Sequence, residues 1–93
     1  MEEQSFDNVW DALTDTAAES ANMTARSDLL IALQRTIASW GLTQAEAAKR
    51  LGITRPRITD LLGGKIAKFS LDALVNLASQ AGLVVHIHTS EAA

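Results

Sequence analysis

The sequence predicts a small all-α domain of four to five helices that ends in one short β-strand. Apolar residues recur at helical spacing along most of the 93 residues, and capping residues and glycines interrupt that pattern. The strand prediction comes from residues 83–88, LVVHIH, a β-rich run of strand length. We therefore divide the chain into an N-terminal segment (1–24), a central domain (25–82) and a C-terminal strand and tail (83–93).

The composition excludes several classes of protein. The chain has no cysteine, which excludes disulfides, thiolate zinc sites and cysteine nucleophiles. No apolar run approaches the roughly 18 residues of a membrane span, and the N-terminus MEEQSFD lacks the features of a secretory signal. No catalytic set is visible, and His86 with His88 has no third metal ligand nearby. We expect a cytoplasmic protein that is not an enzyme and needs no metal or cofactor.

The net charge of −3 is unevenly distributed along the chain. Residues 1–25 contain six acidic residues and no Lys or Arg, whereas residues 42–68 contain six basic residues and two acidic ones. Such asymmetry indicates different partners for the two parts of the chain.

The N-terminal segment has the pattern of an amphipathic helix over residues 5–21, followed by a connector at residues 20–26, SANMTAR. An acidic residue recurs every four positions from Asp7 to Glu19. Three interpretations of the apolar stripe remain open: it packs on the protein's own helices, it binds a basic partner protein, or it is disordered both alone and with a partner. The residues of this stripe are Phe6, Val9, Trp10 and Leu13.

Two helices are predicted at the start of the central domain. The first follows an apolar stripe from Leu29 to Trp40 and ends at Gly41. Thr43 and Glu46 have the spacing of a capping box, so the second helix covers residues 44–51.

Two more helices complete the central domain. Gly52 permits a chain reversal, and a third helix begins at Thr54–Pro56 and ends near Leu62. Ser70 caps a fourth helix, which ends at Gly82.

The second and third helices, joined at a glycine, form a helix-turn-helix unit. With Ile58 and Leu61 turned inward, the outer face of the third helix suits a DNA major groove, where Arg bonds guanine bidentately. The flanking lysines suit phosphate contacts, and Asp60 can read a base or pair with Arg57. The candidate DNA-binding residues are Gln44, Thr54, Arg55, Arg57, Thr59, Asp60, Lys65 and Lys68.

Residues 42–65, LTQAEAAKRLGITRPRITDLLGGK, resemble the lambda-repressor-like (XRE/Cro) helix-turn-helix family, and more narrowly its HigA-type antitoxin branch. The similarity extends over roughly residues 8–88. It implies that Gln44 contacts the DNA backbone, whereas the candidate residues between 54 and 60 read bases. It also implies a homodimer that represses its own operon at a palindromic operator. The second implied partner is a basic toxin of the RelE/HigB kind, which cleaves mRNA.

The C-terminal strand requires a partner, because a lone strand leaves its backbone groups unpaired. The sequence offers no second strand, so we expect the same strand of a second copy to pair with it. The dimerisation residues on one face of this strand are Leu83, Val85 and Ile87.

Three functions are compatible with these patterns. The leading prediction is a sequence-specific DNA-binding repressor that is also an antitoxin. The alternative is a stand-alone XRE-family regulator, from a phage or its host, without a toxin. A third is an adaptor whose helix-turn-helix binds protein only.

Overall fold

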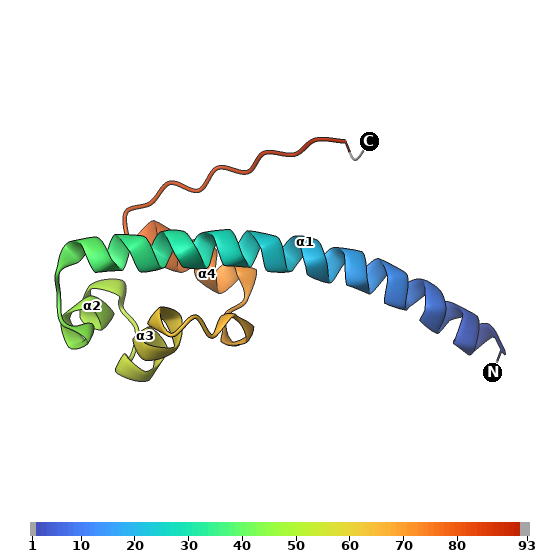
Figure 1. Ribbon diagram of the computed structural model, residues 1–93, viewed down its shortest axis with the longest axis horizontal. Helices are drawn as coiled ribbons and strands as arrows, with labels where there is room; N and C mark the ends of the chain where they lie inside the picture. The colour runs from blue at the N-terminus through green and yellow to red at the C-terminus, as the bar shows by residue number, and fades with distance from the viewer. Residues whose placement is uncertain (1, 92–93) are drawn as a thin grey trace.

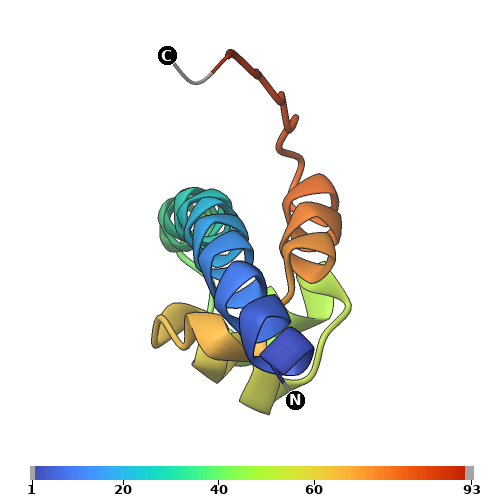
Figure 2. The same ribbon diagram turned by 90° about the vertical axis from the view of Figure 1, so that its right-hand side faces the viewer.

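The computed structural model describes the backbone of residues 2–91 and the side chains of residues 17–91. Its elements are α1 (Glu2–Trp40), α2 (Gln44–Leu51), α3 (Arg55–Leu62), the 3₁₀ helix η1 (Ile66–Lys68) and α4 (Leu71–Gln80). The C-terminal half of α1 lies beside α4, and α2 and α3 cover one side of this pair (Figures 1 and 2). The prediction of an all-α helix-turn-helix domain is confirmed, and η1 is an element that the sequence patterns did not predict.

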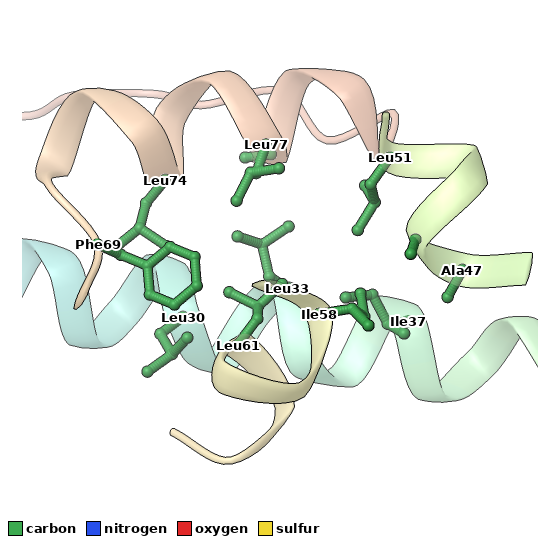
Figure 3. Packing of buried hydrophobic residues seen from close by; sticks show 12 residues of the cluster. Leu30, Leu33, Ile37, Ala47, Leu51, Ile58, Leu61, Phe69, Leu74 and Leu77 are labelled. Atoms are coloured by element: carbon green, nitrogen blue, oxygen red, sulfur yellow. The ribbon is translucent and has the colours of Figure 1, made fainter. Parts of the chain in front are cut away.

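One apolar core joins all four α-helices. Leu33 from α1, Ile58 and Leu61 from α3, and Leu74 from α4 are completely buried. Their side chains converge between the helices, with Phe69 closing one end of the cluster (Figure 3). Burial of such side chains drives folding, since each removes apolar surface from water. The remaining core residues are Leu30, Ile37, Ala47, Ala48, Leu51, Leu77 and Ala78.

Helix α1 is continuous over 39 residues, so the predicted connector at residues 20–26 is wrong. This stretch contains neither Gly nor Pro, and its polar side chains bond within the helix. The Thr24 hydroxyl donates to the Ser20 carbonyl (2.9 Å), and Arg26 Nε donates to Asn22 Oδ1 (2.6 Å). Both bonds join residues four apart, which is the spacing of one helical turn. The N-terminal half of α1 consequently projects beyond the other helices (Figure 1).

Residues 83–91 leave α4 on the side of the molecule away from α3 (Figures 1 and 2). The predicted β-strand is absent from the described residues, which contain no second extended segment to pair with it. The Leu83 N–H donates to the Ala78 carbonyl (2.9 Å), but no backbone hydrogen bond among the described residues involves residues 84–91. The extended tail therefore lacks the ladder that defines a strand.

Candidate nucleic-acid interface

Helix α2 is fixed at both ends by its own residues. The Thr43 hydroxyl accepts from the Glu46 N–H (3.2 Å), and Glu46 Oε1 accepts from the Thr43 N–H (3.0 Å), so the predicted capping box is confirmed. The Thr43 backbone N–H and, second, its hydroxyl lower the pKa of Glu46 below the ordinary value of 4.5. At the other end Gly52 has φ 70°, a left-handed conformation that turns the chain towards α3.

Helix α3 starts where local residues favour it. The Thr54 hydroxyl accepts from the Arg57 N–H (3.3 Å), and Pro56 lies in the first turn, where its missing N–H removes no helical bond. Because Ile58 and Leu61 are completely buried, the helix must turn its opposite face outward. The Gln34 amide of α1 donates to the Leu61 and Leu62 carbonyls (3.1 and 3.3 Å), which fixes the C-terminal end of α3.

The exposed face of α3 begins with Arg55. Thr54, Arg55 and Thr59 are exposed, as predicted. No hydrogen bond or ion pair engages the Arg55 side chain among residues 17–91. The Thr59 hydroxyl donates to Gln44 Oε1 (3.1 Å), which joins the first residue of α2 to the exposed face of α3. An unengaged guanidinium at a helix start can enter a major groove and bond a guanine.

Arg57 is placed differently from Arg55, although both were expected to point outward. Its side chain is half-buried, with its guanidinium carbon 4.1 Å from the centre of the Phe69 ring. Arg57 Nη1 also donates to the Lys68 carbonyl (2.7 Å). This guanidinium is thus held against the segment that follows α3.

Asp60 also faces this segment. Its side chain is 19% exposed, and its carboxylate oxygens lie 3.8 Å from Lys65 Nζ and 3.6 Å from Lys68 Nζ. Asp60 therefore pairs with the two lysines, a partner set that the sequence patterns did not indicate. Both lysine side chains remain more than half exposed.

Three further side chains support the interface without having been predicted to do so. Arg26 Nη1 donates to the Ile66 and Phe69 carbonyls (3.4 Å each), and Gln34 holds the end of α3 as described above. The Arg50 guanidinium carbon lies 4.1 Å from the centre of the Trp40 ring, which links α2 to the end of α1. Residue spacing carries no signal for these contacts, since each joins residues distant in the chain or across a turn.

The tail and α1–α4 border an open apolar groove of about 520 Å³. Leu83 and Val85 are half-buried against the core, but Ile87 is 85% exposed and Val84 is 78% exposed. Of the predicted dimerisation residues, the structure thus places two against the domain and leaves Ile87 in solvent. The side chains predicted to bind a toxin, Phe6, Val9, Trp10 and Leu13, lie outside the residues whose side chains are described.

Other kinds of site find no support in the part of the chain that the structure describes. It contains no group of three or more His, Asp or Glu side chains that could hold a metal ion. Among the helices searched there, none combines the length and apolarity needed to cross a membrane.

Comparisons with known proteins agree with this geometry. The model of a helix-turn-helix domain family matches residues 12–90. A solved structure assigned to the XRE family of transcriptional regulators is similar to this chain, with a TM-score of 0.72 and 30% sequence identity. The similarity covers 80% of this chain and 83% of that one. No curated protein matches the chain.

Proposed function

Because the chain belongs to the XRE-type helix-turn-helix family of DNA-binding transcriptional regulators, we propose that it is a dimeric repressor that reads a palindromic operator through α3. The exposed start of α3 carries this proposal. Arg55 extends there into solvent, while Ile58 and Leu61 anchor the opposite face. A bidentate contact from Arg55 to guanine discriminates by about 1–3 kcal/mol. Gln44 and Lys65 flank α3 and suit the surrounding phosphates.

The test compares Arg55→Ala with Arg35→Ala, which removes the same charge from an exposed position on α1. The probe is a duplex that the parent protein selects from random DNA. We expect Arg55→Ala to reduce the preference for this duplex over unrelated DNA by about 10- to 100-fold. Arg35→Ala should leave that preference unchanged, and both variants should melt like the parent. If Arg55→Ala retards the selected duplex as the parent does, α3 is not the reading helix.

The dimer in this proposal forms through the tails of two copies. Residues 84–91 have no backbone hydrogen bonds among the described residues, and residues 83–88 border an open apolar groove. An antiparallel pairing would satisfy those backbone groups. A palindromic operator would require such a dimer to present its two α3 helices to half-sites about 34–36 Å apart.

Sedimentation tests the dimer directly. The full chain should sediment as a dimer, whereas residues 1–82 should be monomeric and bind the selected duplex weakly, since one unit reads few base pairs. A dimer that survives removal of residues 83–93 would place the interface elsewhere.

We further propose that the acidic N-terminal segment neutralises a basic, RNA-cleaving toxin. The charge of residues 1–25 supports this role, since six acidic and no basic residues would attract a basic enzyme and repel DNA. Residues 17–24 of α1 are exposed, so this stretch of the helix is accessible to a partner.

A co-transcribed neighbouring gene for a basic protein of about a hundred residues would supply the toxin candidate. Its product should co-purify with the full chain but not with residues 22–93. If both forms retain it, another surface binds the toxin. If neither form does, the chain is a stand-alone regulator.

A further inference from the structure

The segment that follows α3 places two lysines beside the proposed reading helix. This segment, residues 63–69, is named the lysine loop here, and it carries Lys65 and Lys68. Its backbone is fixed at several points. The Lys65 N–H donates to the Asp60 carbonyl (3.0 Å), and Arg26 reaches across from α1 to the Ile66 and Phe69 carbonyls. The loop is therefore a structured part of the interface.

Arg57 is the contact from α3 that fixes the far end of the lysine loop. Its guanidinium stacks on Phe69, which is 1% exposed, and donates to the Lys68 carbonyl at 2.7 Å. A planar guanidinium makes both contacts at once, which an ammonium cannot do in the same geometry. A guanidinium engaged in this way is oriented towards the loop, in contrast to the unengaged Arg55.

Asp60 completes the arrangement from the same helix. Its carboxylate lies within 4 Å of both ammonium groups, which gathers two positive charges beside α3. A bare carboxylate at this place would repel DNA phosphates, but here two lysines offset its charge. Because both ammonium groups remain exposed, they stay available to phosphates.

We infer that Arg57 and Asp60 are positioning residues rather than base readers, and that they hold Lys65 and Lys68 where these contact DNA phosphates. This inference rests on the proposed DNA-reading role of α3 and divides that role in two. Arg55, with Thr59 beside it, supplies sequence preference. Arg57 and Asp60 supply affinity that is independent of sequence, through the lysine loop.

The matched variants Arg55→Lys and Arg57→Lys test this division, since both keep the charge and lie two residues apart. Binding is measured against salt for the duplex selected by the parent and for unrelated DNA of equal length. Arg57→Lys should weaken binding to both DNAs by the same factor. It should also make the slope of log K against log salt shallower by about 0.9–1.8, which corresponds to one or two lost phosphate contacts. Arg55→Lys should instead change the ratio of the two affinities.

A second arm asks whether Arg57 acts through the lysines. In a Lys65→Gln/Lys68→Gln background, Arg57→Lys should change affinity by less than about twofold, because the contacts that it positions are already gone. An equal effect of Arg57→Lys in both backgrounds would overturn the inference. So would a change in the preferred base on Arg57→Lys.

The lysine double variant keeps the test informative if Arg57→Lys fails to fold. Both lysine side chains are more than half exposed, so their replacement should leave the core intact. The salt slope should become shallower by about 1.8 with the same preferred sequence. A changed preference would overturn the inference. If the parent bound no DNA, the proposed function itself would fail.

Discussion

The helix-turn-helix, residues 43–63, and the outer parts of the chain differ in the contacts that fix their positions. In the helix-turn-helix, Thr43 and Thr54 cap the two helices, and completely buried side chains anchor α3. The outer parts are residues 17–24 of α1, which are exposed, and the tail, which makes no backbone hydrogen bond beyond Leu83 among the described residues. The first region is held by its caps and by core contacts with α1 and α4, whereas the second keeps its surface exposed.

The proposed function requires two kinds of contact, and this difference suits both. A DNA-reading helix must have a fixed position, because its side chains must meet base edges in register. A segment that pairs with another protein can order on binding, when the partner supplies the missing contacts. Substitutions in the two regions can show whether stability is concentrated in the helix-turn-helix, as the structure indicates.

The largest loss of stability is expected on the buried face of α3. Leu61→Ala should lower the free energy of unfolding by about 2–5 kcal/mol, because it removes a completely buried side chain and leaves a cavity in the core. Ile87→Ala, at an 85% exposed position in the tail, should change it by less than about 0.5 kcal/mol in the monomer. Denaturant unfolding at concentrations where sedimentation shows a monomer measures both. Comparable losses would show that the tail is part of the folded unit.

A smaller loss of stability is expected at the turn between α2 and α3. Gly52→Ala should lower the free energy of unfolding by about 1–2 kcal/mol, since φ 70° is strained for a residue with a Cβ. A methyl group at this position would have open space within 4 Å, so backbone strain alone is measured. Gly52→Asn should lower the free energy of unfolding less than Gly52→Ala does, because Asn adopts the left-handed region more readily than Ala. Equal losses for Ala and Asn would argue against this explanation.

Loss of the α2 cap should have a similar or slightly smaller effect. Thr43→Ala removes the side chain that accepts from the Glu46 N–H, which lowers the free energy of unfolding by about 1 kcal/mol. Thr24→Ala is the matched control, because Thr24 lies inside α1 and caps nothing. Thermal unfolding should show a loss for Thr43→Ala only. A loss of the same size at Thr24 would mean that the cap is not the cause.

The smallest expected effect is the contribution of Glu46 to the pH dependence of folding stability. Its pKa is lower in the folded protein than the ordinary 4.5, so the deprotonated form stabilises the fold. This contribution is present above pH 4.5 and is lost as pH falls through the lowered pKa. Glu46→Gln should remove it, so the difference in stability between parent and variant should shrink on acidification. A difference that stays constant with pH would contradict the assignment.

Elements whose signals are local were predictable from the sequence. The capping box at Thr43 and Glu46, the turn at Gly52 and the cap at Ser70 each act within four residues, and the structure confirms all three. Because these signals mark both ends of α2, its predicted bounds, residues 44–51, match the observed ones. The exposure of Arg55 followed from the same local periodicity.

Features that depend on distant contacts were not predictable. The pairing of Arg57 with the Lys68 carbonyl and Phe69 joins α3 to a 3₁₀ helix that has no clear sequence signal. The continuity of α1 through residues 20–26 was missed because Ser, Thr and Asn commonly end helices, yet here they bond within one. The tail was predicted as a strand, but a strand exists only with its partner, and the described residues do not contain one.

DNA selection with the parent and with Arg55→Gln tests directly whether α3 reads the operator. Arginine prefers guanine, whereas glutamine prefers adenine, at the same place in the major groove. We expect one position in each half-site to change from guanine to adenine while the rest of the selected sequence stays the same. Identical sequences selected by both proteins would contradict the claim that the exposed start of α3 reads the operator.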